Sequence, residues 1–361
     1  MRIITASIGM LAIYSSLSAY IGWNVYVWLQ HLIPLNPWLF ALLWFLWVFS
    51  FLIGRMGHQW LLFSIMGSYW FAFFEYAVLL TPIANIASLF ITAENPALVV
   101  GTIEAVVLLL IFVSGSFLAY NPIVRKLEIT VDAPEADPLH IVLASDFHLG
   151  VLSGKNHLQR FVKKSNSLKP DVVLLAGDLV DDDPIWYARY GMSEVMGELK
   201  AKLGVYGILG NHDYYGKKIP LLVQLMEKSG VSILRDETIS VENRFYLTGR
   251  EDRTFRDRPL LETLKPKSDD LPWIVMDHTP PKLSEPTRLG VDLQVSGHTH
   301  KGQMWPNRFI TKKVFDLDYG HRQINKSHFL VSSGFGFWGP PIRIGSRSEL
   351  WSIKMNFKEQ T

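Results

Sequence analysis

Five short apolar runs between residues 140 and 302 each end in Asp, Asn or His. The runs read "HIVLASDFHLG", "DVVLLAGDLVDDD", "GVYGILGNHDYY", "PWIVMDHTPP" and "VDLQVSGHTHKG". One such cluster would mean little, because Asp and Asn often begin turns and cap helices. Five clusters after five successive strands indicate one shared site, since open α/β sheets bind ligands beyond the carboxyl ends of their strands.

The side chains in these clusters are typical ligands of divalent metals. Carboxylate, amide and imidazole groups without sulfur suit Mn, Fe, Zn, Co or Mg. The chain has no cysteine, which excludes thiolate ligands, disulfides and a cysteine nucleophile. The candidate ligands are Asp146, His148, Asp178, Asn211, His278, His298 and His300. They are too many for one ion with open positions and suit two ions, which can clamp the attacking and leaving oxygens of a displacement at phosphorus. Asp178, on a central strand, is the expected bridge.

The strands that precede these clusters alternate at first with helices. We expect strands at 141–144 and 172–176 and helices at 155–168 and 185–203. This alternation predicts a layered α/β domain. Later strands, in "HFLVSSG" and "ELWSIKM", come with fewer helices. Part of the sheet is therefore expected to be antiparallel or mixed.

Charges are nearly absent from the first third of the chain. No Asp, Glu, Lys or Arg lies between Arg2 and Arg55. Four apolar segments approach the ~20 residues that a spanning helix needs, at about 3–30, 35–54, 60–80 and 97–120. A cleaved signal peptide is the alternative for the first, but its apolar core is only about 7–15 residues long. We predict a four-helix transmembrane region at 1–120 and a catalytic domain at 121–361.

Basic residues are placed unevenly around these segments. They fall before the first, after the second and after the fourth: Arg2, Arg55, Arg125 and Lys126. Because Lys and Arg mark cytoplasmic loops, we expect a multi-pass protein with both termini and the catalytic domain in the cytoplasm. Glu75 and Glu104 lie inside segments, where an ionisable residue is a functional candidate. Alternatively, Glu75 faces a partner helix and Glu104 lies near the interface.

The polar clusters together resemble the motifs of the calcineurin-like metallophosphoesterase superfamily, D-x-H, G-D-x-x-D, G-N-H-D, H and G-H-x-H. The chain has "DFH", "GDLVD", "GNHD", the lone His278 in "DHTP", and "GHTH", in this order. The resemblance covers about residues 126–355. "GHTHKGQ" and "SSGFGFWGPPIR" are similar to its bacterial membrane-anchored branch, which implies a bacterial cell membrane. Purple acid phosphatases carry Tyr at the position of Asp181, so that branch is not indicated.

The resemblance implies an αββα sandwich with a dinuclear site at one edge. It implies these ligands for two divalent ions (Mn, Fe or Zn): Asp146, His148 and His300 for one, Asn211, His278 and His298 for the other, and Asp178 as the bridge. The implied nucleophile is a metal-bound hydroxide, available near neutral pH. His212 would contact the phosphoryl oxygens and act as general acid, and Asp213 would orient its ring.

These expectations describe a phosphoesterase that hydrolyses a phosphate mono- or diester. The apolar segments indicate a lipid-linked or membrane-surface substrate and the lipid bilayer as a partner, and no specific nucleic-acid binding is expected. One alternative is a tethered nucleotide or cyclic-nucleotide phosphodiesterase. Another is a membrane sensor that binds metal without turnover, but the intact Asn211, His212 and Asp213 argue against it, because a binding module needs no acid for a leaving group.

Four further features of the sequence have either one structural interpretation or two competing interpretations. The acidic run at 181–183 is interpreted as a solvated turn and helix cap before Pro184, and His157 as a surface residue of a helix. Residues 334–341, "GFGFWGPP", form either a tight core loop or an apolar rim of the site. The remaining stretch is a basic cluster that either steers anions or pairs with nearby acids: Arg250, Arg253, Arg256 and Arg258. The orientation of Tyr214 and Tyr215 is open.

Overall fold

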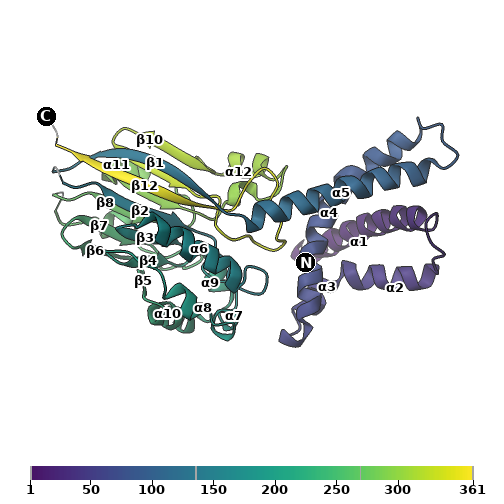
Figure 1. Cartoon of the computed structure of the whole chain (residues 1–361), viewed down its shortest axis with the longest axis horizontal. Coiled ribbons are helices and arrows are strands. Elements are labelled where there is room, and N and C mark those ends of the chain that lie inside the picture. The colour runs from purple at the N-terminus through teal and green to yellow at the C-terminus, as the bar shows by residue number, and fades with distance from the viewer. Residues whose placement is uncertain (1, 135, 269, 360–361) are drawn as a thin grey trace. The chain divides into compact units, whose positions relative to one another are not determined.

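The computed structural model describes residues 2–134, 136–268 and 270–359 (Figure 1). The chain divides into two compact units. One comprises residues 1–115 with Gly339–Pro341, and the other comprises Ser116–Trp338 with Ile342–Thr361. The boundary therefore falls inside the last long helix rather than after it. The assignment of residues 1–120 to a membrane region stays a prediction.

The N-terminal unit is helical. Its elements are α1 (Arg2–Leu29), α2 (Pro37–Val48), α3 (Ser50–Gly54), η1 (His58–Trp60), α4 (Leu61–Ser88) and α5 (Pro96–Tyr120). The side chain of Asn36 begins α2 by accepting hydrogen bonds from the N–H groups of Trp38 and Leu39 at 2.9 and 3.1 Å, the usual role of Asn at a helix start. Pro37 follows at the first helical position, which suits its fixed backbone angle.

Two helices of the described residues, α4 and α5, are long and apolar enough to cross a membrane. The predicted four-helix transmembrane region is thus only partly supported. The second predicted segment is divided, because the backbone of Phe49 leaves the helical region (φ −102°, ψ 10°) and separates the 12 residues of α2 from the 5 of α3. Glu104 of α5 accepts a hydrogen bond from Thr81 of α4 at 2.6 Å, so its carboxylate pairs with a neighbouring helix.

The second unit contains two six-stranded sheets. The first has the order β1 (Ile123–Asp132), β12 (Glu349–Lys358), β2 (Leu139–Ala144), β3 (Val172–Ala176), β4 (Val205–Ile208) and β5 (Val231–Ile233). The second has the order β10 (Gly320–Ile324), β11 (Ser327–Val331), β9 (Leu293–Ser296), β8 (Trp273–Met276), β7 (Phe245–Gly249) and β6 (Glu237–Val241). Strands β2 to β5 are parallel, as are β7, β8, β9 and β11. Antiparallel pairs occur at β12–β2, β10–β11 and β6–β7, so the predicted mixed pairing is confirmed.

The two sheets pack face to face, and helices cover the outer face of the first. Alternate residues of a strand point to opposite faces. Ile141 and Leu143 of β2 therefore join the core between the sheets, while Val142 faces the helical layer. That layer is formed by α6 (Lys155–Leu168), α7 (Ile185–Arg189), α8 (Met192–Met196) and α10 (Ile219–Lys228), seen in Figure 1 beside the first sheet. The two packed sheets with a helical layer agree with the α/β character of the αββα sandwich that the family resemblance implies.

The remaining helical elements are short. They are α9 (Asn211–Tyr215), η2 (Leu261–Leu264), α11 (Ser284–Leu289), η3 (His300–Gly302) and α12 (Arg308–Val314). The single helix predicted at 185–203 is wrong. Gly191 has a left-handed backbone (φ 60°) that separates α7 from α8, and such a residue cannot continue a right-handed helix.

The prediction that His157 lies on the surface is also wrong. His157 is buried on α6, and its Nε2 lies 2.9 Å from the carbonyl oxygen of Phe335. Its ring contacts the rings of Tyr120 and Phe337. Phe335 and Phe337 are buried while Trp338 is more than half exposed. The stretch that begins at Gly334 therefore contributes first to the core and then to the surface.

Candidate metal centre

The seven predicted ligands come together where five strands end. Strands β2, β3 and β4 are neighbours in the first sheet, and β8 and β9 are neighbours in the second. Parallel neighbours bring their carboxyl ends to the same edge, and the two packed sheets bring those edges together. The backbone links the first two loops directly, since the N–H groups of Asp146 and His148 donate to the carbonyl oxygens of Gly177 and Asp178 at 2.9 and 3.0 Å.

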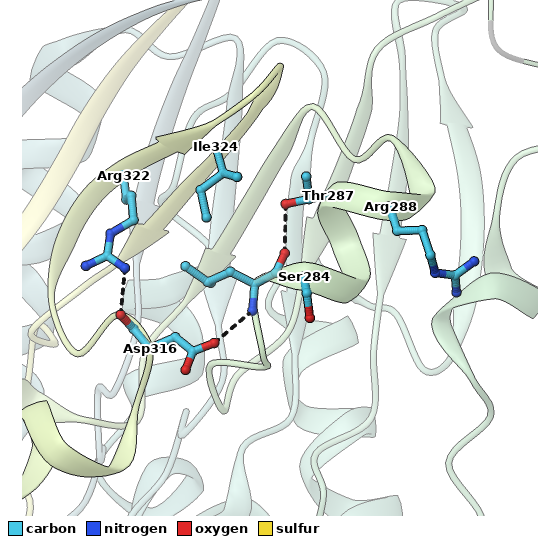
Figure 2. Close-up of a pocket in the computed structure, with 7 residues that line it drawn as sticks. Ser284, Thr287, Arg288, Asp316, Arg322 and Ile324 are labelled. Carbon is cyan, nitrogen blue, oxygen red and sulfur yellow. Dashed lines mark hydrogen bonds between the residues drawn. The ribbon is translucent and has the colours of Figure 1, made fainter.

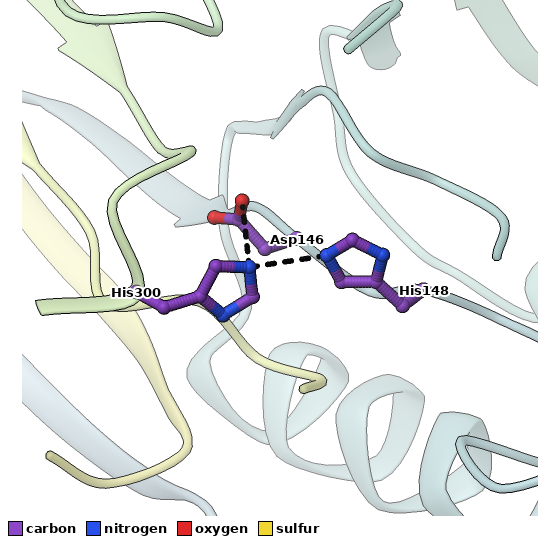
Figure 3. Close-up of side chains that lie close together, drawn as sticks. All are labelled: Asp146, His148 and His300. Carbon is purple, nitrogen blue, oxygen red and sulfur yellow. Dashed lines mark hydrogen bonds and ion pairs between the residues drawn. The ribbon is translucent and has the colours of Figure 1, made fainter. Parts of the chain in front are cut away.

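Figure 3 shows the first group of ligands, Asp146, His148 and His300. The Nε2 atoms of His148 and His300 lie 3.1 Å apart, and Nε2 of His300 lies 3.5 Å from Oδ1 of Asp146. All three residues are buried. Two imidazole nitrogens and a carboxylate oxygen that converge away from water form the donor set of a divalent metal site.

The second group is formed by Asn211, His278 and His298. Oδ1 of Asn211 lies 2.8 Å from Nδ1 of His298 and 3.3 Å from Nε2 of His278. Nδ1 of His278 lies 2.8 Å from the carbonyl oxygen of Ala176. Such a bond to a backbone carbonyl fixes the tautomer of a metal-binding histidine and leaves its other nitrogen free to bind.

The carboxylate of Asp178 lies between the two groups. Its Oδ2 is 3.2 Å from Nε2 of His278 and 3.6 Å from Nε2 of His148. Its Oδ1 accepts a hydrogen bond from the backbone N–H of His212 at 2.9 Å. Asp178 therefore lies close to one predicted ligand of each group, which agrees with its predicted position between them.

Five of the seven residues have a left-handed backbone, with positive φ angles for Asp146, His148, Asp178, His298 and His300 (53°, 44°, 51°, 69° and 49°). This conformation costs about 1–3 kcal/mol at a non-glycine residue and is concentrated at functional sites. Two glycines provide the necessary space. A Cβ on Gly177 would lie 2.5 Å from Nδ1 of His278, and one on Gly210 would lie 2.2 Å from Oδ1 of Asp178.

The electrostatics of the site favour a cation. Burial lowers the pKa of His148 to about 3 and that of His298 to about 4, so both imidazoles keep a lone pair at neutral pH. Burial opposes ionisation of Asp178, but the neighbouring His278 and His148 outweigh it and hold the pKa of this carboxyl low. Burial also lowers the pKa of His278, yet Asp178 and Asp146 raise it well above its ordinary value. A metal would displace the proton of His278, as metal binding generally does. The donor set thus fits divalent ions.

His212 lies at the edge of these groups on α9. Its ring is mostly buried and lies 4.7 Å from the ring of His148. Its Nδ1 lies 2.9 Å from Oδ1 of Asp182. Burial lowers the pKa of His212, but Asp182, Asp178 and Asp181 outweigh burial and raise it. His212 is therefore suited to carry a proton beside the ligands.

Residues 139–302, which include all seven ligands and His212, match the family model described as calcineurin-like phosphoesterase. The chain carries a calcineurin-like metallophosphoesterase domain. This places the domain in a family of metal-dependent phosphoester hydrolases, the enzyme class predicted from the sequence.

Three relatives extend the similarity to residues outside the family model. Two are named transmembrane protein with metallophosphoesterase domain. The one from Bos taurus is 31% identical over 256 residues, and the one from Danio rerio is 32% identical over 253 residues. Each alignment covers 65% of this chain and 57% of the relative, so the chain spans little more than half the length of these two proteins. An uncharacterized metallophosphoesterase of Campylobacter jejuni is 29% identical over 256 residues, 69% of this chain and 67% of that protein.

The metallophosphoesterase domain differs from the sequence prediction at Asp213. The hydrogen bonds of its carboxylate are to backbone groups rather than to the His212 ring. The carboxylate accepts hydrogen bonds from the backbone N–H groups of Gly210, Val180 and Leu179 at 2.8, 3.0 and 3.2 Å. Asp213 thus joins the start of α9 to the loop after β3. The partner of the His212 ring is Asp182, in the acidic run that was interpreted as a solvated turn.

Sequence reasoning missed Arg343. This arginine is fully buried, and one of its Nη atoms lies 3.3 Å from Nδ1 of His300 and 2.6 Å from the carbonyl oxygen of Gly336. Gly336 in turn donates its N–H to the carbonyl oxygen of Asp146 at 2.8 Å. Arg343 therefore holds the 334–336 loop against the first ligand group. The only sequence signal was one charge in the apolar stretch "GPPIRIG".

Contacts of two arginines and two tyrosines bear on two further questions that the sequence left open. Arg250 and Arg258 both approach the buried carboxylate of Asp277, the residue before His278. They thus pair with an acid outside their own loop. Tyr214 packs at the edge of the core and donates its hydroxyl proton to Glu251, whereas Tyr215 is exposed and its ring lies 5.0 Å from that of His212.

A pocket of about 570 Å³ elsewhere on the domain, lined by α11, β10 and Asp316, contains none of the ligands (Figure 2). Its polar groups bond to one another. Arg322 donates to the carbonyl oxygen of Asp316 at 2.8 Å, and the Asp316 carboxylate accepts from the N–H of Leu283 at 3.3 Å. The pocket is therefore separate from the metal centre.

Proposed function

We propose that this protein hydrolyses a phosphate mono- or diester at a centre that holds two divalent ions, Mn, Fe or Zn. The observation that carries the proposal is the position of the Asp178 carboxylate, within 3.2 Å of His278 and 3.6 Å of His148. A single ion would leave one of the two ligand groups without a role. When bound, the ions would supply charge neutralisation of the phosphoryl group and an activated water near neutral pH.

The ligand residues would divide as the resemblance implies. Asp146, His148 and His300 would hold one ion, Asn211, His278 and His298 would hold the other, and Asp178 would be shared. The bond from His278 to Ala176 and the contact of Arg343 with His300 keep two of the rings in place. Such supporting contacts matter because mutation of outer-shell partners commonly costs 10–100-fold in metal affinity or activity.

His212 would donate a proton to the leaving oxygen. Asp182 engages Nδ1, so Nε2 is the nitrogen available to the substrate. The raised pKa of His212 keeps this nitrogen protonated to higher pH, where a general acid is needed. Asp213 acts one step further away, by fixing the backbone of α9 through Gly210.

The proposed substrate is lipid-linked or lies at a membrane surface. Two helices that can cross a membrane and two relatives named as transmembrane proteins support membrane association. The positions of Arg55, Arg125 and Lys126 favour a multi-pass topology with the domain on the cytoplasmic side. The exposed rings of Trp338 and Tyr215, centred 6.0 and 5.0 Å from the His212 ring, would form an apolar rim.

The test is turnover by the purified full chain in detergent with Mn²⁺, Fe²⁺ or Zn²⁺. A phosphate monoester, a diester and a cyclic nucleotide should be compared for wild type, Asp178→Asn, His212→Ala and the exposed control Asp137→Asn. Activity should survive only in wild type and the control. No turnover with any of these metals would defeat the enzyme proposal, and equal activity of Asp178→Asn would defeat the assignment of the bridge. A preference for the cyclic nucleotide would favour the tethered phosphodiesterase.

A further inference from the structure

Helix α12 carries an exposed apolar surface that the core does not use. Phe309, Ile310 and Val314 are 68%, 63% and 66% exposed, and Trp305, just before the helix, is 53% exposed. Isolated exposed apolar residues are ordinary, but large apolar residues gathered on one short segment mark an interaction site. The residues Trp305, Phe309, Ile310 and Val314 are called the α12 patch below.

The patch lies opposite the side by which α12 is held to the domain. Arg308 and Thr311 contact the carboxylate of Asp318 at 3.4 and 3.1 Å. At about 100° per residue, Phe309, Ile310 and Val314 lie about 100°, 200° and 240° around the helix from Arg308, whereas Thr311 lies at about 300°. The apolar arc therefore faces away from the anchor.

The charges on α12 are basic. Its sequence, RFITKKV, has three basic residues and no acid. Lys312 and Lys313 are exposed. Lys313 falls at about 140°, inside the apolar arc, and Lys312 at about 40°, on its flank. A long lysine side chain in such an arc can place its stem on an apolar surface and its ammonium group at the level of headgroups.

We propose that α12 and Trp305 dock onto the surface of an anionic lipid bilayer. A helix with Phe, Ile and Trp on one face and Lys beside them is suited to lie in a lipid interface, and Lys near an anionic surface adds attraction. A nucleic acid would use the lysines but not the apolar arc, so the bilayer fits more of the observations. The chain also carries two helices that can cross a membrane, so a bilayer is available to it.

A small number of contacts connect α12 to the metal centre, so docking of α12 would affect that centre. The start of α12 packs against η3, which contains His300, and a Cβ on Gly302 would lie 2.4 Å from the backbone nitrogen of Arg308. The side-chain amide of Gln303 also donates to the backbone carbonyl oxygen of Trp338 at 2.8 Å and accepts from the backbone N–H of Trp338 at 2.9 Å. A docked α12 would therefore hold the rim at the lipid headgroups. This consequence rests on the proposed function, whereas docking itself does not.

The absence of cysteine allows a direct test in the full chain. Phe309→Cys and, separately, Val314→Cys would be labelled with a polarity-sensitive dye and placed in nanodiscs with or without anionic phosphatidylglycerol. Ser240→Cys, exposed on β6 of the second sheet, is the matched control. In anionic discs we expect dye at 309 and 314 to shift to shorter wavelength and to be quenched by spin-labelled lipid, and dye at 240 to do neither. Emission at 309 and 314 equal to that at 240 would overturn the proposal.

The charge contribution is tested in the same labelled chains. Each lysine near an anionic surface contributes about 1 kcal/mol, so Lys312→Gln with Lys313→Gln should lower the docked-to-undocked ratio roughly 25-fold. An unchanged ratio, or an equal shift induced by RNA in detergent alone, would contradict docking to anionic lipid. The dye reports position without catalysis. Loss of turnover in wild type with docking intact would therefore reject only the proposed function.

Discussion

Replacement of Asp182 by Asn tests which carboxylate positions His212. The Asp182–His212 contact is 2.9 Å long, and Asp182 contributes to the raised pKa of His212. A hydrogen bond between charged groups contributes about 1.5–3 kcal/mol. The Asp182 side chain is 48% exposed, so solvent screening reduces this to about 1 kcal/mol. We expect Asp182→Asn to lower kcat about fivefold, since 1.4 kcal/mol corresponds to tenfold.

The pH dependence of kcat tests the role of Asp182 more specifically than the size of kcat does. The carboxylate stabilises the protonated form of His212, so its removal lowers the pKa of His212. A general acid with a lower pKa loses its proton at lower pH, and the alkaline limb of the kcat profile should therefore move to lower pH, by less than about one unit for ~1 kcal/mol. The assay is turnover of a phosphate ester as a function of pH with saturating metal.

The neighbouring Asp183 supplies the control. Its carboxylate accepts from the N–H of Ile185 at 3.0 Å and pairs with Lys218 at 2.7 Å. Asp183→Asn should leave the alkaline limb where it is in wild type. The reasoning is refuted if Asp183→Asn moves the limb as far as Asp182→Asn does. It is also refuted if Asp213→Asn moves the limb at unchanged thermal stability while Asp182→Asn does not.

Three further perturbations have definite expected results. Gly210→Ala should abolish high-affinity metal binding, measured by calorimetry, because its Cβ would lie 2.2 Å from Asp178 Oδ1, whereas Gly154→Ala should be tolerated, since its nearest contact would be 3.6 Å. Burial lowers the pKa of His157 to about 4. The unfolded chain then binds more protons between about pH 4 and 6.5, so stability falls as pH falls through that range, by up to about 3 kcal/mol. His157→Gln should flatten the dependence of the melting temperature on pH. Removal of metal with a chelator should lower the melting temperature, because an ion at 100 times its Kd stabilises the fold by about 2.7 kcal/mol.

Each of these expectations has a contradicting outcome. Normal metal affinity in Gly210→Ala would mean that the β4–α9 turn can move away from Asp178. An equal pH dependence of stability in wild type and His157→Gln would mean that His157 is protonated freely in the folded state. A melting temperature insensitive to chelation would show that the ligand groups are stable without cations.

The ligands could be predicted from the sequence because each follows its strand directly. A strand that ends in "ASDFH" or "VSGHTH" fixes the edge at which Asp146 and His298 lie, and the parallel order brings the edges together. Asp182 could not be distinguished from its neighbours in the same way. Its contact with His212 depends on a left-handed backbone at Asp182 itself (φ 60°), and no residue pattern in "DLVDDD" specifies which of three acids takes that conformation.

The burial of His157 and Arg343 also depends on contacts that are distant in sequence. His157 contacts Phe335, which is 178 residues away, and Arg343 contacts His300, which is 43 residues away. Helical periodicity predicts that His157 lies on a helix, but it does not predict which face of that helix the loop around Phe335 covers. The same limit applies to the apolar segments, because hydropathy identified their lengths and not the break at Phe49 that separates α2 from α3.

The central claim is that Asp178 joins two ligand groups into one centre for two ions. The most direct measurement is the number of divalent ions bound per chain, determined by elemental analysis of the active full-length protein and of Asp178→Asn. We predict two ions per active wild-type chain and a loss of both high-affinity binding and turnover in Asp178→Asn. One ion or none in a fully active wild type, or two ions and full turnover in Asp178→Asn, would contradict it.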